Sequence, residues 1–193
     1  MNPESLQADR QLFTAWLLAS FAGWLLGLGL VLAGALLGDL LGSGGARFIL
    51  GVGMGTGVGY MQGRIVKQLY DEAGPWLWAS FVGIGAPFFI TDLLAAAWTS
   101  LPYALPLSVA TGGLLTGYLQ RRILAPHTPA ANWWVAASFA GWSLAAGMAA
   151  VSGMLTGVLP GAWGTIFNLG LILLGGVVLG AVTGGALVWI LRR

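Results

Sequence analysis

The sequence has no cysteine and very little charge. Of its 193 residues, 7% are charged and 58% are apolar. Without cysteine the chain forms no disulfide, no thiolate metal site and no thiol nucleophile. A soluble domain does not need so apolar a composition to bury its core, so we expect the protein to lie in a lipid bilayer.

Groups that perform catalysis or hold cofactors are also scarce. The one histidine, His127, and the one lysine, Lys67, both fall in predicted loops, so no predicted helix offers histidine to haem or lysine to retinal. The sequence contains no His-Glu-x-x-His motif, no P-loop and no serine–histidine–aspartate set. It therefore predicts a protein that is not an enzyme and that holds no cofactor or metal.

Long apolar runs predict an all-α integral membrane fold. Each run approaches or exceeds the ~20 residues that a helix needs to cross ~30 Å of hydrocarbon, and none alternates as the strands of a membrane barrel do. The links between the runs are short, so residues 1–193 are expected to form a single transmembrane domain. The six helices are expected at 12–38, 46–66, 75–98, 103–124, 132–155 and 164–191.

The basic residues near the helix ends predict the orientation, because positive side chains are enriched on the cytoplasmic side. Arg47 falls on one side, and all the others fall on the opposite side, which carries both termini. We therefore expect cytoplasmic termini, and this topology explains the formal net charge of +2 better than a nucleic-acid partner does. The residues on the cytoplasmic side are Arg10, Arg64, Lys67, Arg121, Arg122, Arg192 and Arg193.

An internal repeat divides the sequence into three helical hairpins, at about 12–68, 75–125 and 131–193. Each hairpin starts and ends in the cytoplasm, which predicts a pseudo-threefold bundle of six helices about an axis along the membrane normal. One block recurs on the odd-numbered helices: Trp16, Ala19, Ser20, Phe21 and Gly23; Trp76, Ala79, Ser80, Phe81 and Gly83; Trp134, Ala137, Ser138, Phe139 and Gly141. Another recurs on the even-numbered helices: Gly55, Gly59, Tyr60 and Gln62; Gly113, Gly117, Tyr118 and Gln120; and, with two replacements, Gly180, Gly184, Gly185 and Leu187.

Glycines spaced four apart give the even-numbered helices a stripe without side chains. Lipid removes the hydrophobic drive between helices, so close van der Waals contact along such stripes holds a bundle together. We therefore expect helix packing here rather than a glycine-lined pore or ligand groove. The packing glycines are Gly51, Gly55, Gly59, Gly63, Gly113, Gly117, Gly176, Gly180 and Gly184.

Polar residues recur at one depth of the predicted bundle. Ser20, Ser80 and Ser138 lie about one turn inside the cytoplasmic interface, and Gln62 and Gln120 lie at a comparable depth on the returning helices. Hydroxyl–amide bonds between membrane helices are worth roughly 0.6 to 2 kcal/mol, which is enough to fix register. We expect these residues to join helices rather than to form a polar relay or ion path, and the leucine of the third copy argues against a fully threefold polar layer.

Most of the ten tryptophans fall near the predicted membrane boundaries, which predicts an aromatic belt. Only Trp24 and Trp142, at equivalent positions of the first and third repeats, lie deeper. They either face lipid, pack in the bundle or flank a bound hydrophobic molecule, and packing is favoured. The belt residues are Trp16, Trp76, Trp78, Trp133, Trp134 and Trp189 on the cytoplasmic side, and Trp98 and Trp163 on the outer side.

The second repeat departs most from the shared pattern in its outer half, at Asp92. This residue follows Trp76 by 16 positions, or about 24 Å along a helix, which places it in the outer part of the bilayer. A carboxylate in hydrocarbon costs a few kcal/mol or more and needs a partner or water. Two hypotheses follow: an ion pair with Arg47, or an outward-open ligand pocket that includes Thr91 and Tyr103. The favoured alternative is that helix tilt or a proline kink brings the carboxylate to the headgroups.

The blocks at 16–24, 113–124 and 180–193 resemble those of uncharacterised bacterial membrane proteins with tandem tryptophan-alanine-serine and glycine-glutamine hairpins. The resemblance covers nearly the whole chain, and the third copy departs from it at Leu187. It implies a six-span bundle of the bacterial inner (plasma) membrane, and it carries no assigned activity and no functional residues.

Two functions from different classes fit these observations. The first is non-catalytic: a structural or accessory subunit, or a binder of a hydrophobic ligand, with lipid and either another membrane protein or a second copy as partner. The second is a small-molecule transporter, or the substrate-binding component of one, with an outward-facing site near Asp92. In size, in its six expected spans and in its cytoplasmic termini, this chain resembles the substrate-binding subunits of energy-coupling vitamin importers. A threefold repeat is not the hallmark of those subunits. Ala15 and Ala19 are similar to the small-residue pair by which those subunits dock.

Overall fold

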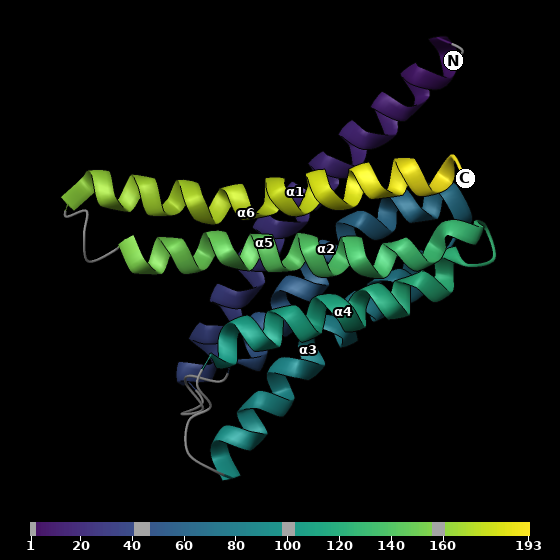
Figure 1. The fold of residues 1–193 in the computed structure, drawn as a ribbon. Coiled ribbons are helices and arrows are strands. Elements are labelled where there is room, and N and C mark those ends of the chain that lie inside the picture. Colours follow the sequence, from purple (N-terminus) through teal and green to yellow (C-terminus); the bar gives the residue numbers. More distant parts are fainter. Residues whose placement is uncertain (1–2, 41–46, 98–102, 156–160) are drawn as a thin grey trace.

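The computed structural model describes residues 3–40, 47–97, 103–155 and 161–193, and within these ranges it contains helices and no strand (Figure 1). The expected all-α fold is confirmed. Six long helices follow one another, and a short 3₁₀-helix precedes the fifth. They are α1 (Pro3–Leu40), α2 (Phe48–Tyr70), α3 (Ala73–Ala97), α4 (Ala104–Leu124), η1 (Pro129–Asn132), α5 (Trp133–Leu155) and α6 (Gly161–Leu191).

Two helix boundaries differ from the predicted ones by more than three residues. The second helix ends at Tyr70, not at residue 66, so Lys67 lies in a helix and not in a loop. The first helix begins at Pro3, not at residue 12, and its first turns project beyond the other helices (Figure 1). Its polar first residues nevertheless suit a helix start, because proline is tolerated in the first turn and Glu4 complements the positive end of the helix dipole. The apolar run that predicted the helix marks only its membrane-compatible part.

Four of the helices are long and apolar enough to cross a membrane: α1, α3, α5 with η1, and α6. Large apolar side chains are exposed along the outside of the bundle, including Leu18, Leu32, Leu36, Ile90 and Ile166. An apolar exterior of this kind suits lipid as the surrounding medium. The other two helices, α2 and α4, are 23 and 21 residues long and are less apolar on average than these four.

The six helices form a closed ring. Each helix packs against the next along the chain, and α6 packs against α1. The ring has a narrow end, where α2, α4 and α6 finish, and a wide end, where α3 diverges from the α5–α6 pair (Figure 1). The helices are therefore closer together at one end of the ring than at the other.

Three tryptophans fill the ring at its narrow end. Trp16, Trp76 and Trp134 are 0%, 0% and 1% exposed, and their ring centroids lie 5.5 to 5.7 Å apart. They occupy one position of the sequence repeat. The belt interpretation is wrong for these three residues, because their indoles point into the bundle; Trp78, Trp133, Trp163 and Trp189 are exposed, and Trp98 lies outside the described residues.

The two glutamines of the sequence repeat, Gln62 and Gln120, each join three helices beside these tryptophans. Gln62 on α2 donates to Ser20 on α1 at 2.9 Å and accepts the indole N–H of Trp76 on α3 at 3.4 Å. Gln120 on α4 makes the same contacts one hairpin later, at 2.9 Å to Ser80 and 2.8 Å to the indole of Trp134. All of these side chains are buried, so each bond forms where water does not compete.

The third hairpin makes its contact differently, as the leucine of its second block suggested. Leu187 is fully buried and offers no hydrogen bond, and Ser138 donates instead to the carbonyl oxygen of Gly113 at 2.9 Å. The indole N–H of Trp16 is accepted by Thr183, one turn earlier on α6, at 2.9 Å. The three repeats therefore share one tryptophan layer but not one polar layer.

All nine packing glycines face atoms of a neighbouring helix. In each hairpin, at least one of them lies against the repeated serine of the next odd-numbered helix, where an added Cβ atom would lie closer than 3.0 Å to that serine. These separations are shorter than a side chain tolerates, so the serine layer depends on glycine opposite it. These contacts join Gly55 and Gly59 to Ser80, Gly117 to Ser138, and Gly180 to Ser20.

Candidate ligand cavity

A cavity of about 240 Å³ lies inside the ring, on the wide side of the three tryptophans. All six helices contribute to its wall, and the wall is almost entirely apolar. The lining residues are Trp24 and Leu28 of α1, Leu50 and Met54 of α2, Ile84 and Phe88 of α3, Leu105 and Val109 of α4, Trp142, Ala146 and Ala149 of α5, and Ile172 of α6.

The cavity arises where the second repeat breaks the pattern of the other two. Trp24 and Trp142 lie eight residues after Trp16 and Trp134, and the same step from Trp76 leads to Ile84. The two indoles pack with their centroids 6.2 Å apart, and the shorter isoleucine leaves the third sector unfilled. The layer of Trp16, Trp76 and Trp134 is thus filled by three indoles. The next layer has only two indoles, those of Trp24 and Trp142, and it contains the cavity.

Glycines hold Trp24 in its place in the cavity wall. A Cβ atom on Gly176 would lie 2.7 Å from Trp24, and one on Gly175 would lie 2.9 Å from the same ring. The indole N–H of Trp24 donates to the carbonyl oxygen of Ile172 at 2.9 Å. Of the three interpretations of Trp24 and Trp142, lipid exposure is excluded, because they are 6% and 5% exposed, and both line the cavity.

Asp92 has a structural partner, but this partner is not Arg47. Its carboxylate accepts the backbone N–H of Phe48, the first residue of α2, at 2.7 Å, and no ion pair joins Asp92 to Arg47. Of the two hypotheses for Asp92, the ion pair with Arg47 is therefore wrong. The N-terminal N–H groups of a helix lack partners within the helix and attract negative charge, so a carboxylate from α3 satisfies the start of α2.

Thr91 and Tyr103 do not join Asp92 in one enclosed pocket. Thr91 is 7% exposed and contacts the hydroxyl of Ser108 on α4 at 2.7 Å. Tyr103 is 82% exposed at the start of α4. None of these residues, nor Arg47, lines the apolar cavity. The contacts of Asp92 and Thr91 join neighbouring helices and do not form a ligand pocket. The candidate ligand site is the cavity inside the ring.

Replacing Asp92 tests this capping role. We expect Asp92→Ala to lower the free energy of unfolding by about 0.5 to 2 kcal/mol, the usual cost of losing a helix cap, and Asp92→Asn to cost less because its carbonyl oxygen still accepts. Denaturant titration in mixed micelles measures both. Asp39→Ala, at an exposed carboxylate on α1, is the control. A loss of the same size in Arg47→Ala would contradict the cap and restore the ion pair.

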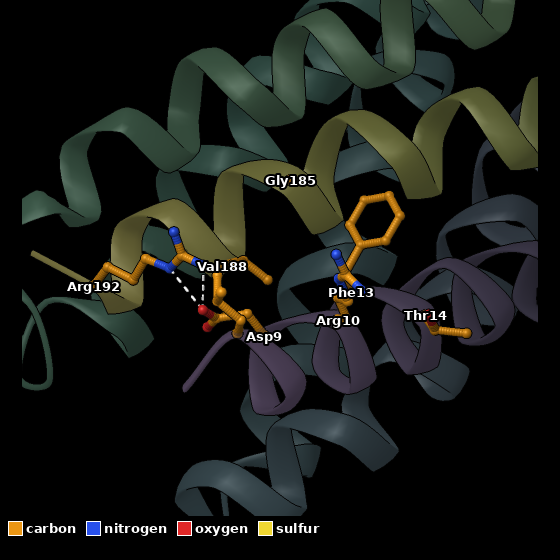
Figure 2. Close-up of a pocket in the computed structure, with 8 residues that line it drawn as sticks. Asp9, Arg10, Phe13, Thr14, Gly185, Val188 and Arg192 are labelled. Carbon is orange, nitrogen blue, oxygen red and sulfur yellow. Dashed lines mark hydrogen bonds and ion pairs between the residues drawn. The ribbon is translucent and has the colours of Figure 1, made fainter. Parts of the chain in front are cut away.

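A second, open pocket of about 420 Å³ lies between the start of α1 and the end of α6 (Figure 2). Asp9 accepts two hydrogen bonds from Arg192 at its edge, and Arg10 and Phe13 also line it. Gly185 forms part of its wall, at the position that is tyrosine in the other two repeats. This pocket is wide open, and its main contact is an ion pair that joins the first helix to the last.

Sequence reasoning missed the cavity, although a signal was present. The equivalence of Trp24 and Trp142 was visible, but the comparison was not extended to Ile84, which reveals the missing indole. Comparison of the chain with known proteins finds no family model, no curated protein and no solved structure that matches it. The function is therefore argued from the cavity alone.

Proposed function

We propose that this chain is a six-span protein of the bacterial inner membrane, with both termini in the cytoplasm, that binds a small hydrophobic molecule inside its ring. The role is non-catalytic. The observation that carries the proposal is the apolar cavity to which every helix contributes. A cavity that is only a packing defect between two helices would not draw its wall from all six.

The proposal that all six helices span is supported by the closed ring. Because α2 packs between α1 and α3, and α4 packs between α3 and α5, these two helices run beside helices that are long and apolar enough to cross a membrane. Their lengths of 23 and 21 residues meet the ~20 residues required. The packing glycines of these two helices, and their buried Gln62 and Gln120, face neighbouring helices, where lipid does not reach them.

The size of the cavity indicates the size of the ligand. An apolar cavity of about 150 Å³ in another protein holds benzene, so 240 Å³ suits a molecule of about ten non-hydrogen atoms. The walls contain no titratable side chain. Binding here is therefore driven by apolar burial and shape, and the site offers no group that accepts or donates a proton in a reaction.

Transport is supported less well than binding. A transporter must open its site to each side in turn, whereas the narrow end here is filled by three buried indoles and their hydrogen bonds to Gln62, Gln120 and Thr183. Docking through Ala15 and Ala19 is also disfavoured. Ala19 is 8% exposed, so it lies in the bundle rather than on a free outer face.

Filling the cavity tests the proposal. We expect α-methylstyrene, a small aromatic hydrocarbon, to bind the protein in nanodiscs, and Ala146→Phe to weaken binding at least tenfold because the new ring occupies the cavity. Titration calorimetry measures both, with partition into empty nanodiscs subtracted. Ala150→Phe, one turn later on α5 and exposed, is the matched control and should bind as the parent does. Binding that is absent, or equal in the parent and Ala146→Phe, would refute a ligand site in this cavity and leave the accessory role.

A further inference from the structure

The two equivalent tryptophans of the cavity wall differ in their hydrogen bonding. Trp24 donates its indole N–H to the carbonyl oxygen of Ile172 on α6. Trp142 is 5% exposed, and its indole N–H has no acceptor among the described residues. An unsatisfied buried N–H costs about 1 to 3 kcal/mol, so nearly all such groups in proteins have a partner.

The unpaired N–H belongs to a side chain that lines the cavity. Nε1 of Trp142 is not one of the fully enclosed polar atoms that lack a partner in the described residues, so it borders open space. The space that Trp142 lines is the cavity. By the repeat, the residue of α4 that corresponds to Ile172 of α6 is Leu105, and it lines the same cavity. Beside Trp142, the cavity therefore occupies the position at which Trp24 has the carbonyl oxygen of Ile172.

We propose that the ligand is a small, otherwise apolar molecule with one oxygen acceptor, such as a ketone, an aldehyde or an ester, that accepts a hydrogen bond from Nε1 of Trp142. The inference rests on the proposed function, because it names the chemical class that the same cavity takes. The ligand's oxygen supplies for Trp142 what the Ile172 carbonyl supplies for Trp24.

The rest of the wall limits the ligand to that one polar group. Apart from the two indoles, the wall consists of aliphatic side chains, one phenylalanine and one methionine, and the Trp24 N–H is already bonded. A second hydroxyl, amide or charged group would lose its hydrogen bonds with water and gain none. Sugars, nucleotides, amino acids and metal ions are excluded on this ground.

A pair of probes of the same shape isolates the hydrogen bond. Acetophenone and α-methylstyrene differ only in a carbonyl oxygen against a methylene group. Calorimetry on the full chain in nanodiscs gives the affinity for each, referred to its partition into empty nanodiscs. We expect the parent to prefer acetophenone by about 2- to 10-fold, the ratio that one hydrogen bond implies. Trp142→Phe should remove the preference, and Trp133→Phe, an exposed tryptophan on the same helix that does not line the cavity, is the control and should retain it.

The indole ¹H–¹⁵N signal of Trp142, assigned as the one missing in Trp142→Phe, gives a second measurement that does not depend on affinity. Acetophenone should shift it downfield, and α-methylstyrene should not. Equal affinity for both probes in the parent, or a preference that Trp142→Phe retains, would overturn the oxygen-acceptor inference while leaving a hydrophobic site. Failure of both probes to bind would instead refute the proposed function itself.

Discussion

Replacing Trp134 by alanine should lower the free energy of unfolding by about 3 to 5 kcal/mol, the range for truncating a large buried aromatic side chain. The residue is 1% exposed, contacts the other two indoles of the narrow end, and donates to Gln120 at 2.8 Å. The substitution therefore leaves a cavity among three repeats and a buried amide oxygen without its donor. Denaturant titration in mixed micelles measures the loss.

The preceding residue provides the control for this variant. Trp133 has the same side chain on the same helix, but it is 63% exposed. We expect Trp133→Ala to change the free energy of unfolding by no more than about 0.5 kcal/mol, as substitutions outside packed regions do. Equal losses in the two variants would show that Trp134 acts through the membrane interface, as a belt residue does, and not through the bundle interior.

Replacing Gly57 by alanine should also be strongly destabilising, by about 3 kcal/mol. A Cβ atom there would lie 2.5 Å from the carbonyl oxygen of Gly23 and 2.6 Å from Cα of Gly27, and it would also meet the backbone nitrogen of Gly27. These are backbone atoms of α1, which cannot rotate away as a flexible side chain can, so the two helices must move apart. Overpacking costs typically 1 to 3 kcal/mol and more where neighbours are fixed. The same mixed-micelle titration measures it.

Gly170 on α6 provides the matched control for Gly57. It is exposed, and a Cβ atom added there meets nothing within 4 Å. Gly170→Ala should therefore stabilise the protein by about 0.5 to 1 kcal/mol, the usual gain from replacing glycine inside a helix. If Gly57→Ala were neutral or stabilising as well, the close approach of α1 and α2 would be wrong.

Features that depend on local periodicity were predictable from the sequence. The six helices follow from apolar runs, and the serine and glutamine partners follow from one shared depth on neighbouring helices. The orientation of Trp16, Trp76 and Trp134 was not predictable in the same way. An amphipathic indole near a helix end fits an interfacial belt and a buried hydrogen-bonded layer equally well, and the partner that decides between them is on another helix.

The partner of Asp92 was mispredicted for a related reason. The search for a countercharge considered side chains, and Arg47 was the one basic side chain on that side. The start of α2 offers the carboxylate a backbone N–H instead, at Phe48. The start of a helix carries a partial positive charge that belongs to the backbone and to no side chain. An isolated carboxylate near a predicted helix start should therefore be tested first as a partner of that start.

The bond between Trp16 and Thr183 joins residues 167 positions apart, and the ion pair between Asp9 and Arg192 joins residues 183 positions apart. Both connect the first helix to the last. During synthesis, the amino-terminal hairpin leaves the ribosome long before α6 has been made. The indole N–H of Trp16 therefore has no Thr183 to accept its hydrogen bond until the end of the chain is synthesised. The ring, and with it the full wall of the cavity, is therefore completed only by α6, so a chain that stops after the second hairpin lacks the residues that α5 and α6 contribute to that wall.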